Sequence, residues 1–155
     1  MALTGTFERN IDDKLRLAIP PSLRQGFGIS LSGGLYVAPG NDGCLAIYSE
    51  EGFERFASRL RSLSIGKPNV RKYLRLLYSQ SEQVSLDKQG RIRLPDRLKK
   101  LAGLEREAVI LGVNDHAEVW DKKRWESFFS DTSNEFDDLT TEALDSLLFE
   151  PPKDG

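Results

Sequence analysis

The sequence carries one short pattern twice, and this pattern decides the fold. Residues 11–24 read IDDKLRLAIPPSLR, and residues 86–99 read LDKQGRIRLPDRLK. Both segments place an aspartate four positions before an arginine: Asp12 before Arg16, and Asp87 before Arg91. An internal repeat indicates repeated structure, so we predict that the chain contains two copies of one supersecondary unit.

The likeness of the two halves continues beyond these segments. Each half next has an apolar strand, an Asn-Asp turn, a second strand and a helix. The matching segments are LYVA (35–38) and AVIL (108–111), CLAIY (44–48) and AEVW (117–120), then SEEGFERFASRL and DKKRWESFF. A unit of about forty residues buries too little apolar surface to be stable alone. We therefore expect the two halves to complete one another.

The repeated segment itself predicts two strands with a turn between them. Residues on either side of each Asp-to-Arg turn alternate apolar and polar, as half-buried strands do, so the intervening residues are expected to form a hairpin tip. Pro20 and Pro95 stand where proline can open a helix, and Gly28 and Gly103 stand where a positive φ can close one.

Two longer helices are predicted between the repeated segments. Ser49 is a suitable cap for a helix that carries Phe53 and Phe56 on one face. Apolar residues at helical spacing predict a second helix over 68–80. We expect these aromatic stripes to belong to the core, and Trp125, Phe128 and Phe129 to pack in the same way. The acidic segment from Asp131 is compatible either with a docked amphipathic helix or with a partly ordered extension.

Composition places the chain among cytosolic globular proteins. Of its 155 residues 39% are hydrophobic and 30% charged, and no apolar run is long enough for a bilayer. The first residues lack the layout of a secretory signal, so we expect a cytoplasmic protein. Residues 131–155 contain eight acids and one base, whereas residues 1–130 contain 21 bases and 16 acids. A basic body with an acidic tail is one arrangement that nucleic-acid binders show.

The sequence offers little for catalysis or metal binding. It contains no phosphate loop, nucleophile elbow or HExxH motif, so we expect no enzyme, no cofactor and no catalytic residue. Cys44 is the only cysteine and His116 the only histidine, which argues against a metal site. We expect Cys44 to be a buried apolar thiol and His116 a polar turn residue.

The two tips allow two interpretations from the residues alone. In the first, Asp12 and Asp87 only fix turns, through backbone amides or through the following arginine. In the second, the tips also present cations to DNA, because an arginine held by a carboxylate suits bidentate contact with guanine and a two-stranded ribbon fits the major groove. The cations concerned are Lys14, Arg16, Lys88, Arg91 and Arg93.

The two quoted segments, with the strands and helices that follow them, resemble the MraZ family, whose fold is of the AbrB-like swapped-hairpin class. The resemblance covers about residues 4–129 and includes both DxxxR motifs. It implies an α+β fold, mainly β with flanking helices, in which two tandem swapped-hairpin β-barrel half-units form one compact domain. The expected organisation is a first repeat over 1–63, a connecting helix over 64–80, a second repeat over 81–130 and an acidic tail over 131–155.

The resemblance also implies a function. It predicts a nucleoid-associated, sequence-specific DNA-binding transcription regulator that represses the bacterial division and cell-wall gene cluster. Such a protein would bind direct repeats of double-stranded DNA in its own promoter as an octamer-like ring of identical chains, without a membrane or a small-molecule substrate. The alternative is a non-catalytic structural or protein-interaction module.

The DNA-binding residues implied by the resemblance lie at both tips. Arg16 and Arg91 would contact bases or phosphates, Lys14 and Lys88 would contact phosphates, and Asp12 and Asp87 would orient the arginines; Arg93 completes the set. One residue departs from the family pattern, because Leu15 stands where the second tip has Gly90. Either Leu15 takes a positive φ at a cost of about 1 kcal/mol, or the first tip has another shape.

Overall fold

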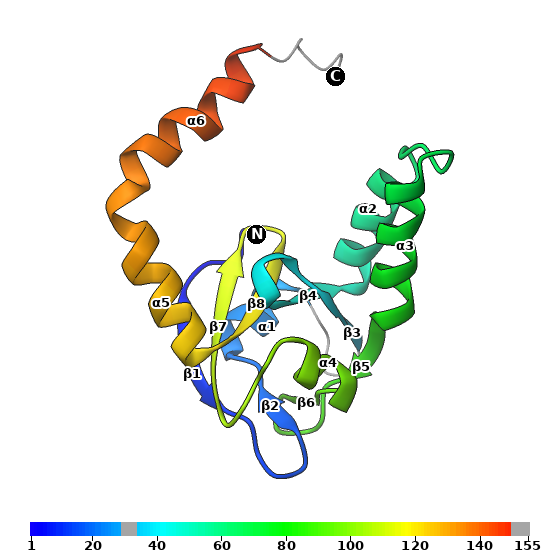
Figure 1. Ribbon diagram of the computed structural model, residues 1–155. Coiled ribbons are helices and arrows are strands. Elements are labelled where there is room, and N and C mark those ends of the chain that lie inside the picture. Colours follow the sequence, from blue (N-terminus) through cyan, green and yellow to red (C-terminus); the bar gives the residue numbers. More distant parts are fainter. Residues whose placement is uncertain (29–33, 150–155) are drawn as a thin grey trace. The chain divides into compact units, whose positions relative to one another are not determined.

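A computed structural model describes residues 1–28 and 34–149 (Figure 1). The strands are β1 (Thr6–Asn10), β2 (Arg16–Ala18), β3 (Gly34–Pro39), β4 (Leu45–Ser49), β5 (Glu82–Ser85), β6 (Arg91–Arg93), β7 (Glu107–Val113) and β8 (His116–Asp121). The α-helices are α1 (Pro21–Gly26), α2 (Glu50–Leu60), α3 (Pro68–Gln80), α4 (Asp96–Leu101), α5 (Lys122–Thr132) and α6 (Phe136–Phe149). The chain forms two compact units, Met1–Lys122 and Lys123–Gly155.

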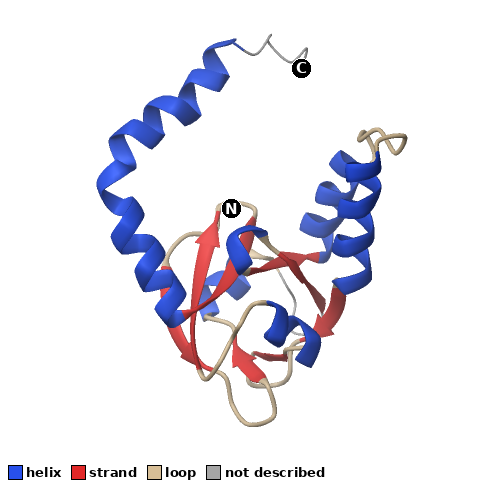
Figure 2. Ribbon diagram, viewed as in Figure 1, coloured by secondary structure: helices blue, strands red, loops and turns tan. Residues whose placement is uncertain are grey.

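The first unit is built on an antiparallel sheet in which the two halves exchange strands. Its six strands follow the order β1-β7-β8-β4-β3-β5. The first strand of each half thus pairs with the hairpin of the other half, β1 with β7 and β5 with β3, while β4 and β8 join the two hairpins in the middle. This exchange confirms that the halves complete one another, and it confirms the α+β class with mainly antiparallel strands (Figure 2). The sheet is not closed into a barrel.

A second, two-stranded sheet carries the tips. β2 pairs antiparallel with β6, so that Leu17 lies opposite Ile92. The prediction that each tip joins two strands of one hairpin is therefore wrong: β1 and β2 flank the first tip but belong to different sheets. The reason is that Leu17 and Ile92 are fully buried, and pairing between the halves places both in one shared core.

The core of this unit draws on both halves. Its main cluster joins Leu17, Ile19 and Leu23 to Ile92, Leu94 and Leu98, all with at most 2% of their surface exposed. These six residues occupy matching positions of the two quoted segments, so the repeat places the same apolar side chains into the core twice. The short helices α1 and α4 begin directly after Pro20 and Pro95, and Gly28 and Gly103 have φ values of 68° and 60°, as predicted.

A second aromatic cluster fixes helices α2 and α3 to the sheet. The Ser49 side chain caps α2 by accepting a hydrogen bond from the Gly52 N–H, at 3.0 Å. The buried ring of Phe53 stacks on Tyr36 with centroids 4.3 Å apart and meets Tyr48 edge to face. The predicted core role of the aromatic stripe on α2 is confirmed at Phe53.

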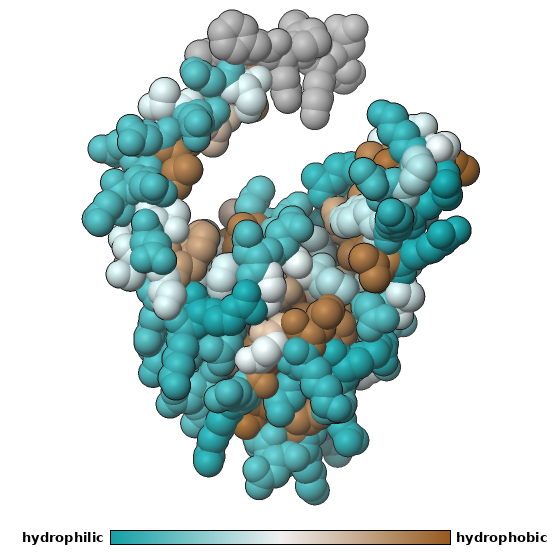
Figure 3. Space-filling model, in the orientation of Figure 1, coloured by the Kyte–Doolittle hydropathy of each residue, from teal (hydrophilic) through white to brown (hydrophobic). Residues whose placement is uncertain are grey.

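The second unit consists of helices whose apolar side chains are largely exposed. Trp125 stacks on Phe128, and its centroid lies 5.9 Å from that of Phe129. Phe128 and Phe129 are 39% and 58% exposed, so the prediction that they are core residues is wrong. The acidic segment forms α6, which carries exposed Phe136, Leu139, Leu144 and Leu147 (Figure 3). No helix in the described ranges is both long and apolar enough to cross a membrane.

Candidate nucleic-acid interface

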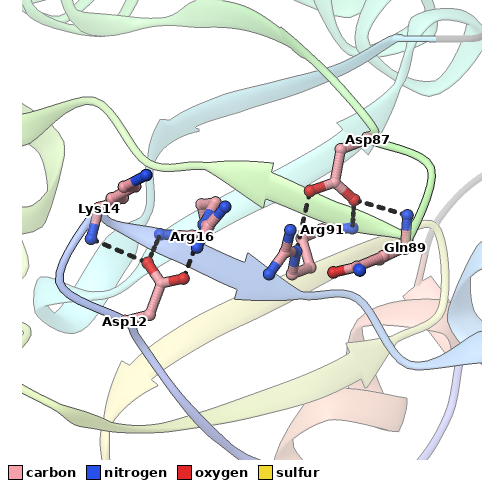
Figure 4. A network of polar contacts seen from close by, with 6 residues as sticks. All are labelled: Asp12, Lys14, Arg16, Asp87, Gln89 and Arg91. Carbon is pink, nitrogen blue, oxygen red and sulfur yellow. Dashed lines mark hydrogen bonds and ion pairs between the residues drawn. The ribbon is translucent and has the colours of Figure 1, made fainter.

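The first tip, residues 12–16, is organised by the carboxylate of Asp12. Oδ1 accepts hydrogen bonds from the backbone N–H groups of Lys14 and Arg16, at 3.0 and 2.8 Å. Oδ2 accepts one from Nε of Arg16 at 2.7 Å, which completes an ion pair (Figure 4). One carboxylate therefore fixes both the turn and the guanidinium group, so the backbone contacts and the ion pair that were expected as alternatives for Asp12 occur together.

The second tip, residues 87–91, repeats this geometry. Oδ1 of Asp87 accepts from the backbone N–H groups of Gln89 and Arg91, at 2.8 and 2.9 Å. Oδ2 accepts from Nε of Arg91 at 2.8 Å. In each tip Nε is the arginine atom that bonds the aspartate, so both terminal nitrogens of each guanidinium group remain without an acceptor among the described residues.

Leu15 adopts the backbone conformation of its glycine counterpart. Its φ is 61°, close to the 76° of Gly90, and both tips close with a hydrogen bond to the carbonyl of the aspartate. The first tip thus has the same shape as the second. Of the two possibilities for Leu15, the structure shows the positive φ. The half-buried Leu15 side chain packs against the main core, which offsets a backbone cost of about 1 kcal/mol.

Each tip is also held by the other half of the chain. The Leu15 carbonyl accepts a hydrogen bond from the Leu94 N–H at 2.8 Å, and the Gly90 carbonyl accepts one from the Ile19 N–H at 3.0 Å. Because these bonds are reciprocal, the tips are positioned by the exchange of strands and not by local sequence alone.

Hydrogen bonds to the charged carboxylates lower the pKa of both aspartates. For Asp12 the largest effect comes from the Arg16 backbone N–H, and the Arg16 side chain acts in the same direction. The Arg91 backbone and side chain lower the pKa of Asp87 in the same way. Both aspartates are therefore ionised at neutral pH, which keeps the arginines in place.

The remaining cations predicted for the interface lie at or beside the tips. Lys14 and Lys88 are exposed, and neither forms an ion pair with a described residue. Arg93 is exposed at the end of β6, directly opposite Arg16 in the pairing of β2 and β6. Arg91 lies opposite Ala18, so the two ends of the ribbon differ. The structure brings all seven predicted site residues to this ribbon and its two turns.

The two tips differ in charge. Residues 12–16 contain two acids, Asp12 and Asp13, and two bases, which cancel. Residues 87–91 contain one acid and two bases, because Lys88 stands where the first tip has Asp13. The second tip is therefore the more cationic of the two.

One further arginine, Arg24, lies at the second tip, although the sequence pattern did not indicate it. Arg24, in the last turn of α1, donates from Nε to the Ile19 carbonyl at 3.1 Å. Its guanidinium group lies directly over Gly90: a Cβ atom at Gly90 would come within 2.6 Å of Nη1 of Arg24. In the repeat, Arg24 aligns with Lys99, so a cation at this position was the one hint in the sequence. The spacing of the residues does not indicate that α1 contacts the tip of the other half.

A second polar cluster was also missed. His116 was expected to be an ordinary turn residue, but it begins β8 and its ring stacks on Tyr48. Nδ1 lies 2.7 Å from Oδ1 of Asp115 and Nε2 lies 3.4 Å from Oε2 of Glu118. The contact with Glu118, together with that to Asp115, raises the pKa of His116. His116, Glu118 and Tyr48 line a cavity of about 410 Å³, together with residues of α2 and α3.

Comparison with known proteins agrees with the repeated architecture. The family model "MraZ protein, putative antitoxin-like" matches the chain twice, over residues 2–76 and 77–147. Transcriptional regulator MraZ of Lactobacillus helveticus is 38% identical over 143 residues, which cover 92% of this chain and 96% of the relative. Transcriptional regulator MraZ of Moorella thermoacetica is 34% identical over 141 residues, covering 91% and 96%.

A third relative, transcriptional regulator MraZ of Acetivibrio thermocellus, is 38% identical over 127 residues, which cover 82% of this chain and 86% of the relative. The two family matches meet within α3, so each match contains one of the two tips. With both repeats matched and the relatives aligned over most of their length, the chain belongs to the MraZ family.

Proposed function

We propose that this chain is a transcription regulator that binds double-stranded DNA through its two tips. The names of its relatives support regulation of transcription. The observation that carries the DNA-binding part is the pose of Arg16 and Arg91, each held through Nε by an aspartate with its terminal nitrogens free of described acceptors.

This pose suits recognition of DNA. A guanidinium group that is fixed before binding loses little conformational freedom, and its two terminal nitrogens can make a bidentate contact with guanine O6 and N7 or with a phosphate. The aspartates neutralise most of the arginine charge, so Lys14, Lys88 and Arg93 supply the net positive charge that attracts phosphates.

The ribbon of β2 and β6 supports the same proposal. A two-stranded ribbon fits the major groove, and this one has a tip at each end (Figure 4). Arg16 and Arg93 lie directly opposite each other in the ribbon, so the two strands offer guanidinium nitrogens to the same phosphate.

The finer features of the function are part of this proposal. A single chain with few uncompensated cations binds DNA weakly, so several identical chains, arranged in a ring and contacting successive direct repeats, would raise the affinity through avidity. We propose that the target is the chain's own promoter, at the head of a division and cell-wall gene cluster, and that binding represses it in the cytoplasm at the nucleoid. Binding DNA in this way requires neither catalysis nor a cofactor.

The proposal is tested by fluorescence anisotropy with a labelled duplex from the region upstream of the chain's own gene and a scrambled duplex, at two salt concentrations. We expect the wild-type protein to prefer the upstream duplex and to weaken steeply with salt. The double variant Arg16→Ala, Arg91→Ala should lose at least about tenfold in affinity, since each bidentate contact contributes about 1–3 kcal/mol.

The matched control is Lys72→Ala, Arg75→Ala, which removes two exposed positive charges from α3 and leaves the tips intact. Equal losses in both double variants would mean that only net charge matters and would contradict the assignment to the tips. Equal, weak binding of both duplexes by the wild-type protein would instead favour a role as a protein-interaction module. Light scattering on each variant reports whether the oligomeric state has changed.

A further inference from the structure

We infer that Arg24 is a further DNA-contacting arginine, in addition to Arg16, Arg91 and Arg93, and that it binds a phosphate beside the second tip. This inference rests on the proposed function and extends its binding site to a helix outside the repeated DxxxR motifs. Arg24 lies in α1 of the first half, and the tip that it serves belongs to the second half.

Arg24 is held in the same manner as the two motif arginines. Nε donates to the Ile19 carbonyl at 3.1 Å, and the Ile19 N–H in turn donates to the Gly90 carbonyl at 3.0 Å. Arg24 is thereby fixed, through one residue, to the backbone of the second tip. Its anchor is a neutral carbonyl, whereas Arg16 and Arg91 are paired with carboxylates, so Arg24 keeps its full positive charge at the surface.

The charge of Arg24 has no partner in the described part of the chain. No described carboxylate lies within ion-pair distance of its guanidinium group, in contrast to Arg16, Arg91 and Arg97. Arg24 is only half-exposed, and its Nε is already bonded. A rigid, uncompensated guanidinium group with free terminal nitrogens is suited to a phosphate oxygen.

The difference between Leu15 and Gly90 supports this assignment. At Gly90 a Cβ atom would meet Nη1, Cζ and Nε of Arg24 at 2.6, 2.7 and 3.0 Å, so the guanidinium group occupies the space of a side chain. In the first tip Leu15 has the same backbone conformation and does carry a side chain. The residue at the position of Arg24 is there Lys99, so the first tip lacks an equivalent arginine. Glycine at the second tip thus leaves room for Arg24.

The net charge of the second tip is consistent with phosphate binding by Arg24. The acids and bases of residues 12–16 cancel, while residues 87–91 have an excess of one base. Arg24 adds a further positive charge beside residues 87–91. Because phosphate neutralisation supplies the salt-dependent part of DNA affinity, Arg24 should contribute to that part.

The test is a salt titration of Arg24→Gln, measured by anisotropy with the duplex from upstream of the chain's own gene. Loss of one phosphate contact should lower the slope of log K against log salt by about 0.9 for each bound subunit and weaken binding several-fold near 0.1 M salt. The matched control is Arg75→Gln, which removes one arginine from the exposed surface of α3 and should leave the slope unchanged.

Three outcomes separate this inference from the proposed function. A smaller slope for Arg24→Gln with an unchanged slope for Arg75→Gln supports it. If Arg24→Gln binds more weakly but keeps the wild-type salt slope, or if Arg24→Gln and Arg75→Gln lose the same affinity, the inference is wrong. The proposed function still holds in either case if Arg91→Ala weakens binding. If the wild-type protein shows no salt-dependent binding, both the inference about Arg24 and the proposed function are wrong.

A second measurement needs no variant, in case Arg24→Gln does not fold. The wild-type protein is treated with phenylglyoxal, which modifies accessible arginines, with and without the upstream duplex, and the peptides are quantified by mass spectrometry. We expect the duplex to protect Arg24 together with Arg16 and Arg91, and to leave Arg75 unprotected. Unchanged modification of Arg24 alongside protection of Arg91 would contradict the inference.

Discussion

Leu15 and Gly90 occupy equivalent positions in the two tips and share a left-handed backbone, with φ values of 61° and 76°. The carbonyl of each accepts a hydrogen bond from the opposite half of the chain, from the N–H of Leu94 and of Ile19. The exchange of strands, together with the aspartate at the start of each tip, therefore imposes the turn conformation even on a residue that disfavours it.

Alanine at Gly90 should cost more stability than alanine at another glycine with positive φ. Gly103 has a φ of 60° and open space where its Cβ would lie, so Gly103→Ala should cost only the backbone strain of about 1–2 kcal/mol. Gly90→Ala adds the collision with Arg24, and urea unfolding should show the larger loss. Equal losses would mean that Arg24 moves away freely.

Acid should weaken both tips. Because the pKa of Asp12 and Asp87 is lowered by folding, their contribution to stability is present above the ordinary value of 3.8 and is lost as pH falls through the lower folded value. The variant Asp12→Asn, Asp87→Asn should be less stable than wild type at pH 7, and urea unfolding should show this difference shrinking below pH 3.8. A difference that is independent of pH would contradict the ion pairs.

His116 should make stability fall toward alkaline pH. Its pKa is raised above the ordinary 6.5 by Glu118 and Asp115, so its contribution is complete below pH 6.5 and is lost as pH rises through the folded pKa. Since it is the only histidine, its ring protons can be followed by NMR without assignment. The titration midpoint should lie above 6.5, and His116→Gln should remove the alkaline loss of stability. A midpoint at or below 6.5 would refute the role of the two carboxylates.

The Cys44 thiol should be unreactive in the native protein. It is 3% exposed, which confirms the predicted buried thiol, and burial raises its pKa to about 12. Thiolate is the reactive form, so Ellman's reagent at pH 8 should react slowly with native protein and rapidly with protein unfolded in guanidinium chloride. Rapid reaction of the native protein would indicate that the hairpin of β3 and β4 opens readily.

Phe53 should contribute strongly to stability and Phe129 hardly at all. Phe53 is buried and stacked on Tyr36, so Phe53→Ala should cost about 3–5 kcal/mol in chemical unfolding. Phe129 is 58% exposed, so Phe129→Ala should change stability by less than about 0.5 kcal/mol. A large loss at Phe129 would mean that another surface covers it, and light scattering would then test for contacts between chains.

The location of the proposed DNA-contacting residues was predictable because the motif that carries them repeats. An aspartate and an arginine four residues apart, flanked twice by the same apolar positions, indicated two tips with organised arginines, and all seven predicted residues lie at the ribbon or its turns. The helix over Pro68–Gln80 was predictable from its helical periodicity. The hairpins of β3 with β4 and β7 with β8 were predictable from their apolar strands and turn residues.

The pairing of strands was not predictable in this way. Alternation places Leu17 and Ile92 on a buried face, but it does not say which strand lies beside them, and the nearest strand in sequence was the wrong choice. The exposure of Phe128 and Phe129 was missed for a related reason, because helical spacing identifies an apolar face and not what covers it.

The sequence by itself determined that the chain has two like halves, where the helices and the hairpins of β3 with β4 and β7 with β8 lie, and where the two Asp-to-Arg turns fall, because these features depend on residues close together in the chain. Only the tertiary structure decided that the halves exchange strands, that Leu15 takes the backbone of a glycine, and that Arg24 of one half lies over Gly90 of the other. These contacts join residues far apart in sequence. They form because the apolar residues of both halves are buried in one core, and a local sequence pattern does not show which strands are brought together in that core.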